Sequence, residues 1–328
     1  VYYYDKTNNP TLEQRYPGLT DEQRLKKICD ALDWDVKRVL TPEQIRAKED
    51  LSGEYNKYVR VIERGNGQKS YLRLYEDNYR HPTETEISAA LKRMVIKSPV
   101  VAFLTGHGER SIDGIGERDY YAFSQYKDFR NSLVNQGFES ISLSLDSVNK
   151  VPENIDILVI SDVRTALSPK EQEIIENYIA EGRNLLIAGE PRRQEQMNPL
   201  LAPLGLSFMP GILVQESKDF STDLILANPT MASLNVINRF DKLLAFGNQI
   251  TMPSAVGIKQ TDEKGFKVVP ILTTDSTGSW NELETTNFIE DTARINPSIG
   301  EVEQANTTMM YLNREVNNRE QRIIVLGD

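Results

Sequence analysis

The peptide whose residue types could most readily do chemistry reads Thr-Gly-His-Gly-Glu-Arg and spans Thr105 to Arg110. It directly follows an apolar run, Val100 to Leu104, which is typical of a buried β-strand. Open α/β sheets bind ligands at the carboxyl ends of their strands, so this position favours a binding or catalytic role. His107 could act as a general base beside Glu109, which would indicate hydrolase or amidotransferase-like chemistry.

The spacing of the glycines argues against a nucleotide-binding loop at this place. Such a loop needs Gly-x-Gly-x-x-Gly running straight into a helix, so that phosphate meets free backbone amides. Gly106 and Gly108 are instead followed by Ser111, and the next predicted helix begins only near Asp119. In the simplest alternative, the glycines let the backbone turn sharply above the sheet, while the histidine and the glutamate hydrogen-bond to neighbouring loops.

Partners for a catalytic or metal-binding histidine are scarce in the sequence. Acyl transfer needs a nucleophile, and the chain contains no Gly-x-Ser-x-Gly elbow. The other histidine, His81, precedes Pro82 near the N-terminus, so no His-rich ligand set exists. A single cysteine, Cys29, rules out an internal disulfide and a cysteine-based zinc cluster, and its helical pattern predicts a small core residue. A site made only of carboxylates stays possible without a motif, and no cofactor is expected.

Charged residues also follow two further predicted strands. Asp162 and Arg164 follow one apolar run, and Glu190 and Arg192 follow the next. Such residues are commonly solvated or paired with each other, but at one edge of a sheet they could line a pocket together with His107. The candidate ligand- or partner-binding residues are therefore Gly106, His107, Gly108, Glu109, Asp162, Arg164, Glu190 and Arg192.

Composition narrows the class of protein. Among 328 residues, 38 Lys and Arg stand against 48 Asp and Glu, which gives a net charge of -10 without any basic block. Nucleic-acid binding is therefore disfavoured. Apolar runs such as Pro99 to Leu104 are far shorter than the ~18–20 residues of a membrane-spanning helix. An ordinary globular balance of 39% hydrophobic and 26% charged residues predicts a folded α/β protein with a substantial core.

The N-terminal part, residues 1–97, predicts a small α/β domain. Capping boxes at Thr20 and Thr41 begin two helices, and a third helix starts at Thr83. Between them, Lys57 to Glu63 and Ser70 to Tyr75 flank a Gly-Asn-Gly turn, which predicts a β-hairpin.

From Ser98 onward, buried strands alternate with amphipathic helices, which predicts a main α/β domain over residues 98–328 with a mostly parallel sheet flanked by helices. The expected strands cover Val100 to Leu104, Glu139 to Leu143, Ile155 to Ile160, Asn184 to Ala188, Val268 to Leu272, Thr307 to Leu312 and Arg322 to Leu326. The expected helices cover Asp119 to Gln136 and Ser168 to Ala180, ending at Gly137 and Gly182.

Both chain ends suggest a piece of a longer protein. Val1 to Tyr4 is β-prone and begins abruptly, and Arg322 to Leu326 resembles a buried parallel strand followed only by Gly327 and Asp328. Domains seldom end on a core strand. We therefore expect sequence beyond Asp328 and a main domain that is truncated at its C-terminal end.

Several peptides together resemble the extracytoplasmic domain of GldG-type auxiliary components of ABC transporters, the gliding-motility family. The resemblance covers most of residues 98–328 and, more loosely, the opening segment. It is carried by Phe103 to Glu109, Ile157 to Ser161, Leu167 to Glu171, Tyr178 to Gly182, Asn198 to Gly205, Leu272 to Ser276, Trp280 and Arg322 to Asp328.

The resemblance implies a Rossmann-like fold similar to class I glutamine amidotransferase domains but without their activity. It is consistent that the amidotransferase nucleophile is a cysteine after a sheet strand, whereas Cys29 lies in a predicted helix outside the main domain. One departure is Glu181-Gly182-Arg183, where members of the family often carry a glycine pair. Family members are flanked by transmembrane helices, which implies an inner-membrane anchor and a periplasmic or extracytoplasmic location.

The favoured hypothesis is a non-enzymatic accessory domain that contacts the permease and ATPase subunits of an ABC transporter, an exported substrate or an envelope component. One alternative is a hydrolase or amidotransferase relative that uses His107 and Glu109. Another is a module that binds cell-envelope glycans or lipids, in which Trp280, Tyr120 and Tyr121 could stack on a sugar.

Overall fold

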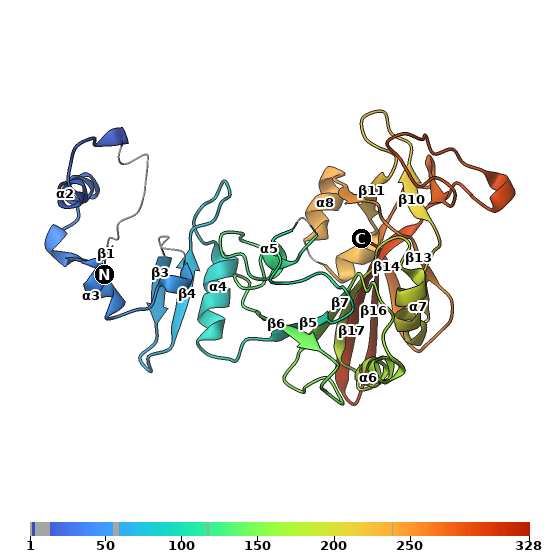
Figure 1. The fold of residues 1–328 in the computed structure, drawn as a ribbon, viewed down its shortest axis with the longest axis horizontal. Coiled ribbons are helices and arrows are strands. Elements are labelled where there is room, and N and C mark those ends of the chain that lie inside the picture. Colours follow the sequence, from blue (N-terminus) through green and yellow to red (C-terminus); the bar gives the residue numbers. More distant parts are fainter. Residues whose placement is uncertain (1, 4–13, 55–58, 117, 238) are drawn as a thin grey trace. The chain divides into compact units, whose positions relative to one another are not determined.

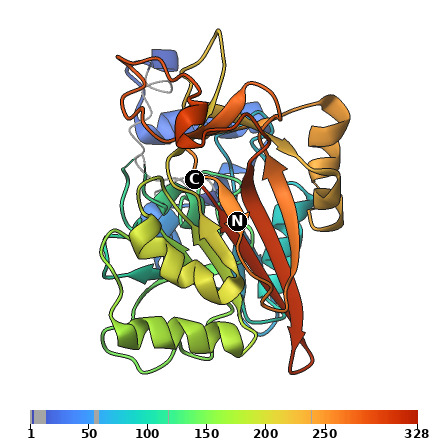
Figure 2. The same ribbon diagram turned by 90° about the vertical axis from the view of Figure 1, so that its right-hand side faces the viewer.

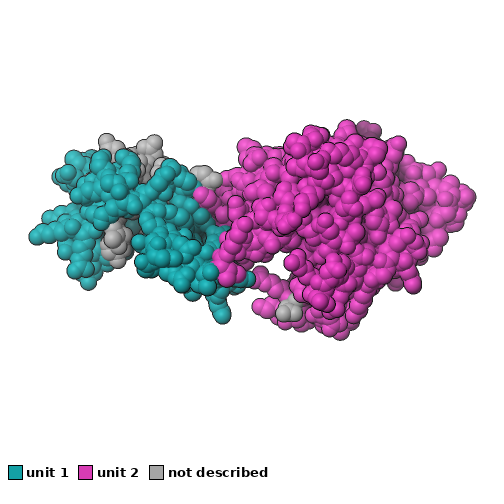
Figure 3. Space-filling model, turned by 90° about the horizontal axis from the view of Figure 1, so that it is seen from below, with its two compact units in different colours: residues 1–95 teal, residues 96–328 magenta. Residues whose placement is uncertain are grey.

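The computed structural model describes residues 2–3, 14–54, 59–116, 118–237 and 239–328. It divides into two compact units, residues 1–95 and residues 96–328, which are coloured separately in Figure 3. In the described part of the chain, no helix has the length and apolar character needed to cross a bilayer.

The first unit opens with a short parallel pair of strands, β1 (Tyr2–Tyr3) and β2 (Val39–Leu40). The predicted opening strand is therefore present, although Val1 and Tyr4 lie outside the described residues. Helices α2 (Asp21–Leu32) and α3 (Pro42–Arg46) begin after complete capping boxes, as predicted. Cys29 is buried in α2, which agrees with the predicted core role.

The predicted hairpin is confirmed as the antiparallel strands β3 (Val59–Glu63) and β4 (Lys69–Arg73). Its expected first two residues, 57 and 58, lie outside the described residues. Buried Arg73 donates two hydrogen bonds, of 2.7 and 2.8 Å, to Glu54 in the 3-10 helix η2 (Ser52–Glu54). Helix α4 (Glu84–Arg93) follows its predicted capping box.

One mixed sheet organises the second unit (Figure 1). Its principal strand order is β12-β11-β14-β16-β17-β8-β7-β5-β6. Neighbours from β17 to β6 pair in parallel, and neighbours from β12 to β17 pair antiparallel. The bounds are β5 (Val100–Thr105), β6 (Glu139–Ser144), β7 (Ile157–Ser161), β8 (Asn184–Ala188), β11 (Leu224–Pro229), β12 (Ile250–Pro253), β14 (Lys267–Thr273), β16 (Thr307–Val316) and β17 (Arg319–Leu326).

These strands include every strand predicted for the main domain, and the terminal one rejoins the sheet beside β8. The α/β class is thus confirmed. Short strands between residues 206 and 282 were not predicted, because prolines and polar residues interrupt their periodicity. They are β11 and β12 of the principal sheet together with β9 (Leu206–Phe208), β10 (Ile212–Gln215), β13 (Ile258–Gln260) and β15 (Ser279–Glu282), of which β10 and β15 form a separate ribbon.

Helices cover the two faces of the sheet differently (Figure 2). On one face, α6 (Pro169–Ala180) and α7 (Gln194–Leu201) pack over a large core that includes Leu185 and Ile187. On the other face, η4 (Met231–Asn235) and α8 (Phe240–Phe246) cover the antiparallel part. Since successive side chains of a strand point to opposite faces, β16 and β17 contribute to both of these cores, and β5, β7 and β8 contribute to the first core and to a smaller cluster on the other face.

The predicted helix from Asp119 to Gln136 is wrong. Only α5 (Tyr121–Ser124) is helical there, and turns fill the rest of the segment. The backbone doubles back, so that the amide of Leu133 donates to the carbonyl of Phe123 over 2.9 Å. Asn135 Nδ2 also donates to nearby carbonyls, and such side-chain bonds compete with helical ones.

Candidate functional site

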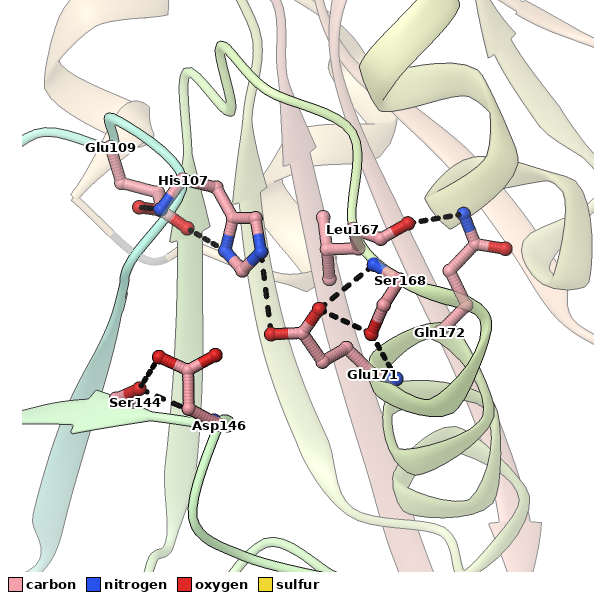
Figure 4. A network of polar contacts seen from close by, with 8 residues as sticks. All are labelled: His107, Glu109, Ser144, Asp146, Leu167, Ser168, Glu171 and Gln172. Carbon is pink, nitrogen blue, oxygen red and sulfur yellow. Dashed lines mark hydrogen bonds and ion pairs between the residues drawn. The ribbon is translucent and has the colours of Figure 1, made fainter.

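The histidine of the Thr105 to Arg110 peptide lies between two carboxylates (Figure 4). His107 Nδ1 is 3.4 Å from Glu109 Oε1, and His107 Nε2 is 3.3 Å from Glu171 Oε1. Both glutamate side chains are nearly inaccessible to solvent, and the His107 side chain is 12% exposed. The backbone amide of His107 also donates to Glu109 Oε2 over 2.7 Å. Glu109 was predicted beside His107, whereas Glu171 was not predicted to take part.

Glu171 occupies the third position of α6, where it completes the predicted capping box. The backbone amide and the hydroxyl of Ser168 donate to Glu171 Oε2 over 2.8 and 2.6 Å. Burial raises the pKa of Glu171, but the hydrogen bonds from Ser168 and the nearby His107 outweigh it and hold this pKa below its ordinary value. The capping-box glutamate was the signal in the sequence that could have identified Glu171 as a candidate. It begins a helix that follows a strand end, so it was expected near the same edge of the sheet as His107.

This geometry limits the chemistry of the cluster. The two carboxylates face opposite nitrogens of one ring, so the three side chains do not converge on a single metal position. Among the described residues, no group of three or more metal-binding side chains is arranged to hold an ion. The Ser168 hydroxyl donates to Glu171 and not to the histidine, so Ser168 is not aligned as a nucleophile for His107.

The two glycines bring the loop into contact with the neighbouring strand end. Gly106 and Gly108 have φ of 124° and 80°, a region that favours glycine. A Cβ at Gly108 would lie 3.1 Å from the Cβ of Arg164. The carbonyl of His107 accepts hydrogen bonds from the amides of Arg164 and Thr165, at 2.9 and 3.1 Å. The simplest alternative, a sharp turn held by neighbouring loops, describes this part of the site.

Asp162 is buried in the loop after β7 and holds two arginines. Its Oδ2 is 3.1 Å from Arg164, and its Oδ1 is 3.1 Å from Arg193. Its φ is 49°, which is uncommon for a residue with a side chain and indicates that the surroundings enforce the conformation. Arg193, which was not predicted, joins this site from the loop after β8.

Glu190 is the centre of a second ion-pair group. It contacts Arg110 directly, and its Oε2 is 3.6 Å from Arg118 Nη1. The Arg110 guanidinium also lies 5.5 Å from the ring centre of Tyr120. Burial raises the pKa of Asp328, while Arg110 and Arg118 oppose that rise. The structure therefore brings the predicted strand-end residues and the C-terminal residue Asp328 together in one charged region at the carboxyl ends of the strands.

A cavity of about 510 Å³ opens beside Glu190. Its lining includes Arg192, whose φ of 65° is again unusual for a non-glycine residue. Arg192 Nη2 donates a long hydrogen bond of 3.4 Å to the carbonyl of Thr286. The other lining residues are Arg118, Glu190, Pro191, Arg193, Ile212, Ser221, Asp223, Ser254, Asn287, Phe288 and Ile289.

A larger cavity, of about 710 Å³, lies on a face of the sheet rather than at the strand ends. Its lining comes from strand residues such as Leu186, Tyr311 and Ile324, together with Val236 and Ile237. None of the predicted binding residues takes part in it.

The structure corrects the predicted role of Trp280 in stacking on a sugar. Trp280 is 3% exposed and packs with Val214, Ala293 and Phe288 in a small core. Its indole nitrogen donates to Glu282 over 3.0 Å. The ring therefore has no free face for a glycan.

Comparisons with known proteins place the chain in a family. Among solved structures, it is similar to the "mmIFT52 N-terminal domain", with a TM-score of 0.46 and 13% identity over 70% of this chain and 86% of that chain. A search of curated proteins found no match. A family model described as "ABC-type uncharacterized transport system" matches residues 98–328, and the chain therefore belongs to this family of ABC-transporter auxiliary proteins.

Proposed function

We propose that this chain is a non-catalytic extracytoplasmic domain of a membrane-anchored ABC-transporter accessory protein of the gliding-motility type. It works by binding the permease and ATPase subunits of the transporter, an exported substrate or an envelope component. Membership of the auxiliary family supports the transport role. The resemblance of Phe103 to Glu109 and of the later peptides to the GldG-type domain supports the extracytoplasmic location.

One observation carries the non-catalytic part of the proposal. Each ring nitrogen of His107 faces a carboxylate oxygen at ion-pair distance, 3.4 Å from Glu109 and 3.3 Å from Glu171, so neither nitrogen is directed at open solvent. A general base must instead keep one nitrogen directed at the proton that it removes. The cluster thus joins the β5 loop to the start of α6 and stabilises the strand edge on which partners are bound.

Co-purification tests the partnership. The natural full-length protein is solubilised in mild detergent and captured by an affinity tag, and the bound permease and ATPase are identified by mass spectrometry. We expect both subunits in wild type and in His107→Gln, because the histidine is structural. The absence of both subunits from the captured wild-type protein would contradict the proposal. A hydrolase activity of the wild-type protein that disappears in a folded His107→Gln protein would also contradict it.

Cysteine labelling tests the location. Cys29 is 1% exposed, so a cysteine introduced at exposed Lys218 supplies the reactive thiol. We expect Lys218→Cys in the full-length protein to react with a membrane-impermeant maleimide in intact spheroplasts. Wild type is the control for reaction at Cys29. Labelling that appears only after the spheroplasts are lysed would place the domain in the cytoplasm and overturn the proposal.

A further inference from the structure

Arginines gather at the carboxyl edge of the sheet, although the chain as a whole carries a net charge of -10. The buried carboxylates there, Asp162 and Glu190, each bind two of these arginines. Arg192 is different, because no ion pair joins it to a carboxylate within the described residues, and its hydrogen bond goes to a backbone carbonyl. Arg192 therefore supplies an excess positive charge that no ion pair neutralises within the described residues.

The 510 Å³ cavity is where this excess charge is accessible. Arg118, Arg192 and Arg193 line it, and Arg118 is 59% exposed. The two acidic lining residues are already engaged. Glu190 binds Arg110 and Arg118, and Asp223 accepts hydrogen bonds from Ser221 and Ser254. The guanidinium groups would therefore attract an incoming anion, whereas Asp223, whose bonds to serine hydroxyls do not neutralise its charge, would oppose it.

Backbone polarity at the cavity has the same sign. Pro191 to Arg193 line it and lead directly into the N-terminus of α7, which no side chain caps. The first turn of a helix presents unpaired amides and a partial positive charge, both of which attract anions. Glu195 lies in this first turn and offsets part of that charge, so the arginines remain the main positive groups of the cavity.

Apolar residues also line the cavity. Ile212, Phe288 and Ile289 line it, and Ile289 is 97% exposed. Phe288 is held in place by its contacts with the Trp280 core. Apolar and cationic residues that line one cavity match a ligand with a charged head and a hydrocarbon part, and the cavity volume is in the usual range for small-molecule sites.

We propose that this cavity binds a small amphipathic organic anion. Arg192, with Arg118, holds its phosphate or carboxylate head, and Phe288 and Ile289 contact its hydrocarbon part. The inference rests on the proposed role of the strand edge as a binding surface and names the chemical class that it accepts. No bond is made or broken.

Isothermal titration calorimetry on the chain tests this proposal with hexyl phosphate, hexanoate and inorganic phosphate. Hexyl phosphate or hexanoate is expected to bind more tightly than inorganic phosphate, and the tighter of the two identifies the head group. Arg192→Gln should weaken that binding about tenfold, as for a lost charged hydrogen bond. Ile289→Ser should weaken binding of the hexyl compound and leave inorganic phosphate unchanged.

Arg319→Gln is the matched control, because Arg319 is an exposed arginine at the start of β17 and does not line the cavity. The absence of binding by all three probes at millimolar concentration would overturn the proposal. An equal loss of binding in Arg192→Gln and Arg319→Gln would also overturn it, since attraction would then be non-specific. These titrations need no transporter subunits, so their failure is distinguishable from a failure of co-purification.

Discussion

Two charged regions lie at the same edge of the sheet, and they differ in how their charges are satisfied. In the histidine cluster, His107, Glu109 and Glu171 face one another and are largely shielded from solvent. In the cavity, Arg192 is exposed and lacks a carboxylate partner among the described residues. Burial with mutual pairing is typical of a structural role, whereas an exposed cation in a concave site is available to a ligand. The arginine cavity, which is less conspicuous in the sequence than the histidine cluster, is therefore the better binding candidate.

Removing the acid of the histidine cluster should have the largest effect on stability. Glu171→Ala removes the carboxylate that accepts from Ser168 in the capping box of α6 and that faces Nε2 of His107. We expect the free energy of unfolding to fall by about 2–4 kcal/mol. Urea unfolding checks this, followed by the fluorescence of Trp280 in a Trp34→Phe background, so that the second unit is monitored.

The control for this measurement is Glu173→Ala, an exposed glutamate in the same helix. It should change the free energy of unfolding by no more than about 0.5 kcal/mol. Equal losses from the two alanine variants would show that helix propensity, and not the histidine cluster, determines the result.

A side chain at Gly108 should break the loop that positions His107. The residue has φ of 80°, and a Cβ would approach Arg164 to 3.1 Å. We expect Gly108→Ala to lower the free energy of unfolding by about 1–2 kcal/mol. Gly265 also has a positive φ, of 72°, but an open space around it. If Gly265→Ala costs as much in the same unfolding assay, the contact with Arg164 contributes nothing.

The pH dependence of stability should reveal the carboxylate of the cluster. Since the pKa of Glu171 is lowered in the folded state, its ionised form contributes stability that is complete above the ordinary value of 4.5. This stability is lost as the pH falls through the folded pKa. Unfolding free energies measured from about pH 6 down to about pH 3 should therefore fall less steeply in Glu171→Gln than in wild type. A slope identical to that of wild type would contradict the assignment.

A substitution in the cavity should change the free energy of unfolding much less than a substitution in the histidine cluster. Arg192 is exposed and makes one long hydrogen bond, so Arg192→Gln should change the free energy of unfolding by less than about 0.5 kcal/mol. A stability loss comparable to that of Glu171→Ala, measured in the same urea assay, would assign Arg192 a structural role and remove the contrast between the two regions.

Much of the local structure was determined by short-range patterns in the sequence. Thr20, Thr41, Thr83 and Ser168 begin helices because side-chain and backbone hydrogen bonds within four residues satisfy the first turn. Apolar runs such as Ile157 to Ser161 form strands because both faces of the sheet are covered. The same patterns placed the candidate residues at strand ends, where the structure has them.

Only the tertiary structure decided which of these residues meet. The segment after Asp119 has helical periodicity, yet bonds from Asn135 to Lys127 and Phe129 replace the helix. Glu171 was visible as a cap, but its contact with His107 depends on the loop turns at Gly106 and Gly108.

The cavity shows the same division between sequence and structure. Its residues Arg192 and Arg193 follow β8. Its apolar residues Phe288 and Ile289 follow β15, a strand without a predictable period. Residue type and spacing determine hydrogen bonds and burial over a few neighbours, so the sequence alone specified helices, strands and their polar ends. Contacts between distant loops depend on the path of every intervening segment, so the histidine cluster and the arginine cavity emerged only in the folded chain.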